Sequence, residues 1–455
     1  MYLSIEDFAS FIPKRPTYAV LGMPVRHSLS PDLQLAFAKI KGLEIDYLRI
    51  EISEDEFPQA MSLAREKLCG FNCTHPFKEM VLDYLNESDS KVKALHSCNT
   101  VQVIDHAFYG YNTDGEGFVN ALALSEVSLE NAAVLLLGCG GAASAIAYEA
   151  SLKGAYLTIA ARNLEKAEAF AKRFSNLSYR TISLADISGE YDIVVNATPV
   201  GMSHMADQTP IALSKLDRVG FVYDTIYSPS TTKLLREAAA LEIPYDNGLS
   251  MLIFQGAASQ RYWFHHQFSK QEQADVLESI TAQRAKTRLN GRNLILSGFM
   301  CAGKSTYGRL LADALGLTFI DTDDALEHEF GCSVSEFFSK YGELEFRKRE
   351  ANLANRLSRE SGYVIGLGGG TILNPDTARA LHKNGFVLFL DTPYHILQER
   401  FKGDTNRPLL KNNNINELYE TRLPLYQKTA DASVCITSSH RVLSKLLNSI
   451  EGEIS

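Results

Sequence analysis

The sequence lacks the features that mark several large classes of protein. No apolar run approaches the ~18 residues of a membrane-spanning helix, and the first residues carry no basic stretch ahead of an apolar one. Lys and Arg number 45 against 54 Asp and Glu, and the net charge of -9 leaves no general surface for nucleic acid. We therefore expect a protein that binds neither membranes nor nucleic acid.

Cysteine is also scarce. The chain has seven cysteines, an odd number, and no two of them stand in a C-x-x-C pair. Disulfide frameworks and zinc sites both depend on paired cysteines, so we expect reduced thiols and a cytoplasmic location. The two halves share no repeat, and the chain contains no low-complexity tract.

The length and composition are those of a globular protein with several domains. Of the 455 residues, 45% are hydrophobic and 22% are charged, which is close to the average for soluble proteins. Such a chain is too long for one ordinary domain, and ~150 residues per domain predicts about three compact units.

Strand-like and helix-like patterns alternate along the whole chain, which predicts an α/β fold. One series covers residues 18–104, and a second begins at residue 133 with the spacing of a doubly wound sheet. A polar stretch over residues 269–292 ends in the turn signal Asn290-Gly291, and a third series follows it. We expect the main boundary, a linker, at residues 285–291, and two halves that work separately as fragments 1–288 and 289–455.

A glycine-rich turn in the second series predicts a dinucleotide site. Residues 138–143 read G-x-G-x-x-A between a strand and a helix, where glycines let a pyrophosphate approach the helix N-terminus. After the next strand, an NAD enzyme usually has an acid, but this chain has Arg162 and then Lys166, which suits the 2′-phosphate of NADP. The expected cofactor contacts are Gly138, Cys139, Gly140, Gly141, Ala142, Arg162 and Lys166.

Further segments of the first half stand in the order of a known family. They are residues 22–31, 72–78, 99–100, 112–114, 196–202, 224–229 and 248–255. Over about residues 18–263 they resemble shikimate dehydrogenase.

The resemblance implies the chemistry of the first half. Reduction of a ketone by hydride needs a proton for the new alkoxide, and a Lys beside a carboxylate can act as acid in one direction and base in the other. The resemblance gives these roles to Lys78 and Asp114. It also implies that the substrate carboxylate is bound by Ser28, Ser30 and Tyr227, the ring hydroxyls by Thr74, Asn99, Asp114 and Gln255, and that the nicotinamide lies beside Thr225 and Gly248.

The third series begins with a phosphate-binding loop. Residues 298–305 read G-x-x-x-x-G-K-S between a strand and a helix, a pattern whose backbone N–H groups cradle phosphates. Lys304 is expected to reach the terminal phosphates and Ser305 to bind Mg²⁺. The expected nucleotide contacts are Met300, Cys301, Ala302, Gly303, Lys304, Ser305 and Thr306.

The segments after this loop also stand in the order of a known family. They are residues 319–323, 342–350, 368–370, 407–410 and 422–426. Across about residues 293–450 they resemble shikimate kinase. The resemblance implies that Arg347 and Arg422 grip the shikimate carboxylate, a task suited to guanidinium forks. It further implies that Asp323 and Gly369 contact the shikimate hydroxyls and that Asp323 is the catalytic base. Asp321 would support Mg²⁺, and residues 402–416 would form a lid over ATP that carries Arg407. Cys301 stands where the family often has Gly, a variation we expect to be tolerated.

Together the two resemblances predict a bifunctional enzyme. A substrate lobe (1–118, completed by 250–284) and a Rossmann-type NADP lobe (119–249) would reduce 3-dehydroshikimate to shikimate with NADPH. A P-loop kinase domain (292–455) with a parallel sheet would then make shikimate 3-phosphate with ATP and Mg²⁺.

Other readings stay open beside this one. The first half could use quinate or NAD, the second half could be a nucleotide-binding regulatory module, or the P-loop could belong to a nucleic-acid-binding protein. The use of quinate or NAD is disfavoured by Ser28, Ser30 and Arg162. A regulatory module would not need the acceptor set of Asp323, Arg347, Gly369 and Arg422. A nucleic-acid-binding protein would need a basic stripe, which the sequence lacks. A monomer and a homodimer are equally open.

Overall fold

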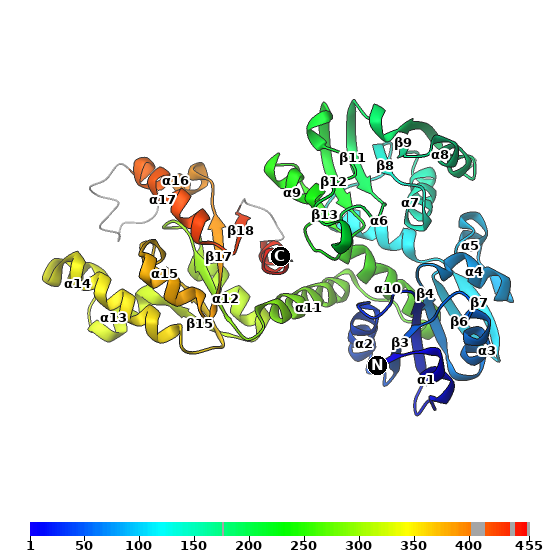
Figure 1. Cartoon of the computed structure of the whole chain (residues 1–455), viewed down its shortest axis with the longest axis horizontal. Coiled ribbons are helices and arrows are strands. Elements are labelled where there is room, and N and C mark those ends of the chain that lie inside the picture. The colour runs from blue at the N-terminus through cyan, green and yellow to red at the C-terminus, as the bar shows by residue number, and fades with distance from the viewer. Residues whose placement is uncertain (175–176, 402–414, 437–441, 453–455) are drawn as a thin grey trace. The chain divides into compact units, whose positions relative to one another are not determined.

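The computed structural model describes residues 1–174, 177–401, 415–436 and 442–452. The chain divides into two compact units, Met1–Leu277 and Glu278–Ser455 (Figure 1). Three mainly parallel sheets carry the fold, so the predicted α/β class is confirmed. No helix in the described parts of the chain has the length and apolar content to cross a membrane.

The first sheet of the N-terminal unit has the strand order β1-β3-β2-β4-β6-β7-β5. β6 runs antiparallel to its neighbours β4 and β7, and the other pairs are parallel. All six residues of β2 are buried, as expected of a strand covered on both faces. The strands are β1 (Tyr2–Leu3), β2 (Thr17–Gly22), β3 (Asp46–Glu51), β4 (Gly70–Cys73), β5 (Glu87–Ser88), β6 (Thr100–Ile104) and β7 (Ala107–Tyr111), and the helices are α1 (Ile5–Ser10), α2 (Ser30–Ile40), α3 (Phe57–Lys67), α4 (Phe77–Met80) and α5 (Ser90–Leu95).

The second sheet is fully parallel, with the order β10-β9-β8-β11-β12-β13. The order reverses between β8 and β11, and such a switch point is where doubly wound sheets bind ligands. Its elements are β8 (Ala133–Leu137), α7 (Gly141–Leu152), β9 (Tyr156–Ala161), α8 (Leu164–Ala171), β10 (Ser178–Ser183), β11 (Glu190–Asn196), β12 (Arg218–Asp224), α9 (Lys233–Ala240) and β13 (Tyr245–Asn247).

Two helices connect the lobes built on these sheets. α6 (Asp114–Leu124) leads out of the substrate lobe and α10 (Leu249–Phe264) leads back, and the two pack against each other. Their contact is close, because a Cβ on Gly117 would lie 2.6 Å from the Met251 carbonyl oxygen.

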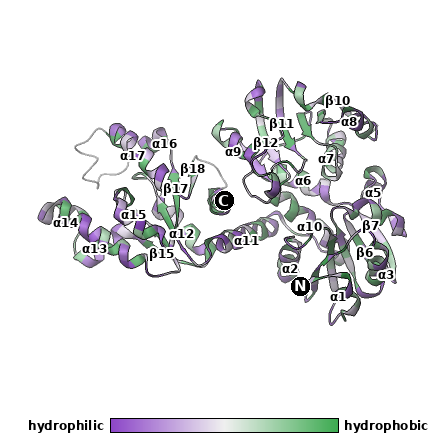
Figure 2. Cartoon of the chain, viewed as in Figure 1, coloured by the Kyte–Doolittle hydropathy of each residue, from purple (hydrophilic) through white to green (hydrophobic). Residues whose placement is uncertain are grey.

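The C-terminal unit has a parallel sheet with the order β15-β16-β14-β17-β18. Its central strands are hydrophobic, as Figure 2 shows for β17. Gly342, at a φ of +78°, breaks α14 into two helical segments. The elements are β14 (Asn293–Ser297), α12 (Lys304–Leu315), β15 (Thr318–Asp321), α13 (Thr322–Phe330), α14 (Val334–Leu357), β16 (Tyr363–Gly366), α15 (Pro375–His382), β17 (Gly385–Asp391), α16 (Tyr394–Phe401), α17 (Ile415–Thr429), β18 (Ala432–Cys435) and α18 (Val442–Glu451).

The linker expected at residues 285–291 is mostly helix. α11 (Lys270–Leu289) runs through it, and only Asn290 and Gly291 form a turn, with φ values of +48° and +78°. Ala282, Ala285 and Leu289 of α11 lie in the core of the C-terminal unit. Their spacing of three and four residues puts them on one helix face, and polar residues are interspersed along the helix (Figure 2). The apolar face was not apparent from the sequence because residues 269–292 are polar overall. The expectation of a linker at residues 285–291 was wrong, because most of this segment is a helix packed into a core.

Candidate functional sites

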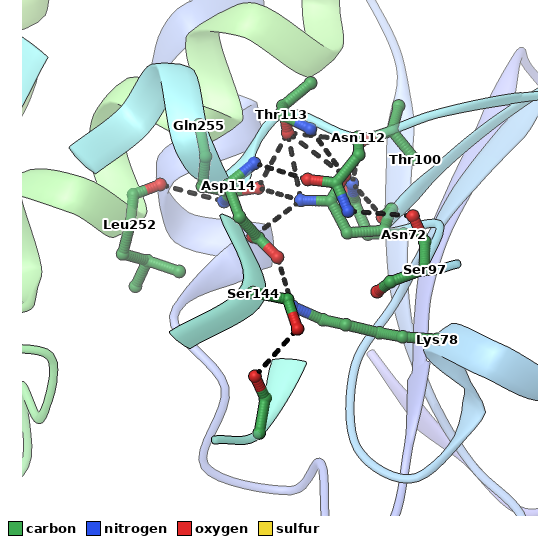
Figure 3. Close-up of polar contacts among 12 residues, drawn as sticks. Asn72, Lys78, Ser97, Thr100, Asn112, Thr113, Asp114, Ser144, Leu252 and Gln255 are labelled. Carbon is green, nitrogen blue, oxygen red and sulfur yellow. Dashed lines mark hydrogen bonds and ion pairs between the residues drawn. The ribbon is translucent and has the colours of Figure 1, made fainter. Parts of the chain in front are cut away.

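The predicted acid/base pair of the N-terminal unit is assembled in the structure. Lys78 lies in α4, Asp114 is the first residue of α6, and Lys78 Nζ is 2.5 Å from Asp114 Oδ2 (Figure 3). The other carboxylate oxygen, Oδ1, accepts a hydrogen bond of 2.7 Å from Asn99 Nδ2. Both oxygens therefore have donors, which fixes the orientation of the carboxylate beside the ammonium group.

An amide network holds this pair. Asn99 Nδ2 also lies 3.3 Å from Gln255 Oε1 of α10, and Asn99 Oδ1 accepts from the Thr113 backbone N–H at 2.9 Å. Asn72 Nδ2 donates to the Asn99 carbonyl at 2.9 Å. The structure thus brings Asn99, Asp114 and Gln255 together as expected for a group that binds hydroxyls. It adds Asn72 and Thr113, which lie inside the quoted motifs but had been given no role.

Residues expected at the substrate carboxylate and at one ring hydroxyl follow the ends of neighbouring strands. Ser28 and Ser30 come after β2 and Thr74 after β4, and these strands are parallel neighbours, so their carboxyl ends share one edge of the sheet. The Ser28 Oγ–Ser30 Oγ distance is 3.0 Å. A Cβ on Gly22 would lie 2.3 Å from Thr74 Cγ2, so glycine lets the two loops approach.

The glycine-rich turn after β8 has room for a pyrophosphate. A Cβ on Gly140 or Gly141 would meet no atom within 4 Å, so the backbone of this turn is open. Gly138 has a φ of +103° and lies close to the Ala197 carbonyl, which requires glycine. Cys139 and Ala142 complete the turn, and α7 begins at Gly141.

Two cations follow β9, where the 2′-phosphate was expected. Arg162 and Lys166 are both exposed, and Asn163 caps α8 by accepting from the Lys166 backbone N–H at 2.9 Å. In the described part of the chain, neither cationic side chain has an ion-pair partner. Both charges are therefore available to an anionic ligand.

A buried carboxylate organises the loops expected at the nicotinamide. Asp224 ends β12 and accepts from Asn196 Nδ2 at 3.0 Å, from the Ile226 N–H at 3.1 Å and from the Thr232 hydroxyl at 2.7 Å. Burial raises its pKa to about 6, although these hydrogen bonds act to lower it. A Cβ on Gly248 would lie 2.0 Å from the Thr225 carbonyl oxygen, so glycine is required there. Tyr227 lies in the loop that Asp224 starts.

In the C-terminal unit the P-loop lines a cavity of about 470 Å³. Lys304 Nζ donates to the carbonyls of Gly298 and Phe299, at 2.9 and 3.0 Å, and so curls over its own loop. Cys301 has a φ of +61°, in the left-handed region that favours glycine. The cavity is lined by Cys301, Gly303, Lys304, Ser305, Thr306, Tyr307, Asp321, Asp323, Asp324, Leu367, Gly369 and Arg400. Arg400, which sequence reasoning missed, donates to the Cys301 carbonyl at 2.9 Å.

The residues expected near Mg²⁺ lie side by side in this cavity. Ser305 Oγ donates to Asp321 Oδ2 at 2.6 Å, and Asp321 Oδ1 accepts from the Asp323 N–H at 3.0 Å. A hydroxyl and a carboxylate fit Mg²⁺, which usually takes few protein oxygens and completes its shell with phosphates and water.

The two arginines expected to bind shikimate converge on the loop at residues 368–370. Arg422 NH1 donates to the Gly369 carbonyl at 3.3 Å, and a Cβ on Gly370 would lie 2.6 Å from Arg347 NH1. Arg347 NH1 is 2.8 Å from Glu350 Oε2, whose side chain is 4% exposed. Thr371 Oγ1 donates to the other oxygen of Glu350 at 2.5 Å, so Glu350 orients Arg347.

Not every expected residue can be placed. Arg407 and most of the lid, residues 402–414, lie outside the described residues.

Three family models match the chain. They are the shikimate dehydrogenase substrate binding domain over residues 20–101, shikimate / quinate 5-dehydrogenase over residues 121–208, and shikimate kinase over residues 300–451.

Curated relatives and solved structures match the N-terminal part. The shikimate dehydrogenase (NADP(+)) of Shouchella clausii is 36% identical over 252 residues, which cover 54% of this chain and 92% of that relative. The enzyme of the same name from Methanococcus maripaludis is 36% identical over 259 residues, which cover 55% of this chain and 92% of that relative. A crystal structure of shikimate dehydrogenase in complex with NADP+ has a TM-score of 0.53 at 31% identity and covers 59% of this chain and 96% of its own. The structure of Thermus thermophilus shikimate 5-dehydrogenase with NADP(H) and shikimate has a TM-score of 0.53 at 30% identity. The match covers 58% of this chain and 98% of that one.

These matches confirm both resemblances and their order along the chain. The N-terminal match covers nearly the full length of the dehydrogenases, and the kinase family model covers most of the C-terminal unit. The chain therefore belongs to the shikimate dehydrogenase family, and with a shikimate kinase domain behind the dehydrogenase it is a bifunctional enzyme of the shikimate pathway.

Proposed function

We propose that the N-terminal unit reduces 3-dehydroshikimate to shikimate with NADPH, and that the C-terminal unit converts shikimate to shikimate 3-phosphate with ATP and Mg²⁺. The observation that carries the first half is the Lys78–Asp114 contact of 2.5 Å, with the hydroxyl-binding amides Asn99 and Gln255 next to it. The second half rests on a phosphate loop and on two arginines that converge on the loop at residues 368–370, Arg422 at Gly369 and Arg347 at Gly370.

In the dehydrogenase, the chain's own residues control the proton. Bound NADPH supplies the hydride. The Lys78 ammonium group donates a proton to the alkoxide that forms, and Asp114 orients Lys78. In the reverse direction neutral Lys78 removes the same proton. Ser28 and Ser30, with Tyr227, hold the substrate carboxylate, and Thr74, Asn99 and Gln255 hold the hydroxyls.

The choice of NADP follows from charge. Arg162 and Lys166 stand after β9 with no acid paired to them in the described residues, and the relatives that match are named for NADP(+). A ribose 2′-phosphate would find two cations there, whereas the 2′-hydroxyl of NAD would lack its usual carboxylate. The open backbone at Gly140 and Gly141 fits the pyrophosphate.

In the kinase, phosphoryl transfer depends on position and charge. Lys304 and the P-loop N–H groups hold the phosphates, and Ser305 with Asp321 supports Mg²⁺. Arg347 and Arg422 hold the shikimate carboxylate, so that the attacking hydroxyl lies beside Asp323, which accepts its proton. Arg407 is proposed, from the family resemblance alone, to neutralise charge on the transferred group.

One experiment tests both halves. The purified chain is incubated with 3-dehydroshikimate, NADPH, ATP and Mg²⁺, and the products are identified by mass. We expect shikimate 3-phosphate with all components, and shikimate alone when ATP is omitted. If no shikimate forms, the dehydrogenase assignment fails, and if shikimate accumulates in the presence of ATP, the kinase assignment fails. The cytoplasmic location stays a prediction from the sequence.

A further inference from the structure

A charged contact joins the two lobes of the dehydrogenase unit. Lys91 lies in α5 of the substrate lobe and Glu149 in α7 of the nucleotide lobe, and Lys91 Nζ is 2.9 Å from Glu149 Oε1. The Glu149 side chain is 10% exposed and that of Lys91 30%, so the pair is partly shielded from water and salt. Neither residue belongs to a motif that carries the family resemblance.

The contact is packed against the helix that begins with Asp114. A Cβ on Gly115 would lie 2.8 Å from Glu149 Oε1, so the carboxylate fills the space that a side chain would take at the residue next to Asp114. Burial alone would lower the pKa of Lys91, but the hydrogen bond and charge of Glu149, with help from Glu116, raise it above its usual value. Lys91 is therefore firmly charged at neutral pH.

Other contacts hold the same region in place. Arg173, which follows α8 in the nucleotide lobe, donates a hydrogen bond to the carbonyl of Leu95, so α5 is held by that lobe near both of its ends. Glu116 forms two contacts of 2.8 Å with the guanidinium of Arg261 in α10, which ties the two connecting helices together. The region behind Asp114 is thus held by charge across the lobes as well as by apolar packing.

We propose that the Lys91–Glu149 pair sets the separation of the two lobes and thereby positions the cofactor against the substrate. This inference rests on the proposed dehydrogenase function. α7 is a stiff link, because it begins at the nucleotide-binding turn and reaches Glu149 about two turns later. Reacting atoms must approach to about 3–3.5 Å, and a displacement of about 1 Å can cost about 100-fold in rate. Lys91 and Glu149 are positioning residues, since they act through α7 and α6.

The test compares single, conservative and reversed variants in the full-length chain. Lys91→Met and Glu149→Gln are each expected to lower kcat for 3-dehydroshikimate reduction by about tenfold, within the usual range of pairwise coupling. The KM for 3-dehydroshikimate and the Kd for NADPH should stay within about twofold, because the binding groups are untouched. Lys91→Arg should keep most of the rate, and Lys91→Glu combined with Glu149→Lys should recover much of it.

Two controls separate this role from a loss of structure. Kinase activity of the same variants reports on the rest of the chain, and Arg218→Met, which breaks an exposed ion pair with Glu190, should leave reduction unchanged. The inference is overturned if both single variants reduce 3-dehydroshikimate within twofold of the unmodified chain, or if the reversed pair is no faster than the single variants. If the unmodified chain shows no reduction, the proposed function fails first and this inference with it.

Discussion

The two active regions of this chain are prepared for catalysis in different ways. In the dehydrogenase, Lys78 and Asp114 already contact each other, at 2.5 Å. In the kinase, Lys304 contacts carbonyls of its own loop, and Arg347 contacts Glu350 and Glu343. The first site holds its proton donor and the carboxylate that orients it in direct contact, whereas the second holds its cations on carbonyl and carboxylate oxygens of the protein.

The chemistry explains the difference. A proton donor for an alkoxide needs one fixed geometry, which an internal ion pair provides. A site for ATP and a carboxylate needs several positive charges, which here are oriented by carbonyl and carboxylate oxygens of the protein. The comparison predicts that variants in the dehydrogenase pair affect kcat, while variants in the kinase cations affect substrate binding as well.

The largest effect is expected from breaking the internal pair. Asp114→Asn removes the charge that orients Lys78 and should lower kcat for 3-dehydroshikimate reduction by about 10²- to 10⁴-fold. Phosphorylation of added shikimate should stay near normal, because Asp114 belongs to the other unit. Reduction within tenfold of the unmodified chain would show that the contact is incidental. Steady-state kinetics of both reactions on one preparation provide the measurement.

The next effect concerns the acceptor arginine of the kinase. Arg347→Ala should raise the KM for shikimate by about ten- to a hundredfold, since charge-assisted contacts contribute about 1.5–3 kcal/mol. Its matched control is Arg356→Ala, which removes another ion pair of the same helix, the one with Glu329. A larger change in kcat than in KM would contradict the view that Arg347 mainly binds substrate.

A smaller effect is expected at the cofactor. Arg162→Ala should weaken the binding of NADPH by about tenfold and leave the binding of NADH nearly unchanged, because only NADPH carries the 2′-phosphate. The KM values for the two cofactors, measured at saturating 3-dehydroshikimate, provide the check. Equal losses for both cofactors would show that Arg162 does not discriminate between them.

The smallest effect concerns the helix that replaced the expected linker. Fragment 289–455 lacks Ala282 and Ala285, which are buried in the kinase core, whereas fragment 270–455 keeps all of α11. Burial of a methyl-sized group contributes about 0.8 kcal/mol, so loss of the two alanine methyls costs about 1.6 kcal/mol, and for a domain of this size the shorter fragment should melt about 3–6 °C lower. Thermal unfolding of the two fragments tests this prediction. Equal melting temperatures would show that residues 270–288 do not stabilise the kinase domain and would support their expected role as a linker.

The motifs could be read from the sequence because each is local. The turn at residues 138–143 and the P-loop each hold their characteristic residues within a few positions, whereas Asp114 was assigned its partner Lys78, 36 residues away, only through the family resemblance. Lys91 and Glu149 are 58 residues apart in the sequence and lie in different lobes, so no local sequence pattern predicts that they pair. The orientation of Arg347 by Glu350 and Thr371 likewise depends on tertiary packing. The apolar face of α11 was not predicted because its apolar residues are spread through a segment rich in Gln, Glu, Lys and Arg.

The central claim, that one chain carries two independent enzymes, is tested most directly by mixing two defective chains. Lys78→Ala should fail to reduce 3-dehydroshikimate, and Lys304→Ala should make shikimate but not phosphorylate it. With 3-dehydroshikimate, NADPH, ATP and Mg²⁺, each variant alone should produce no shikimate 3-phosphate. The mixture is predicted to produce it, as followed by mass, because free shikimate can pass from one chain to the other. A mixture that stops at shikimate, or a Lys304→Ala chain that still phosphorylates, would contradict the account.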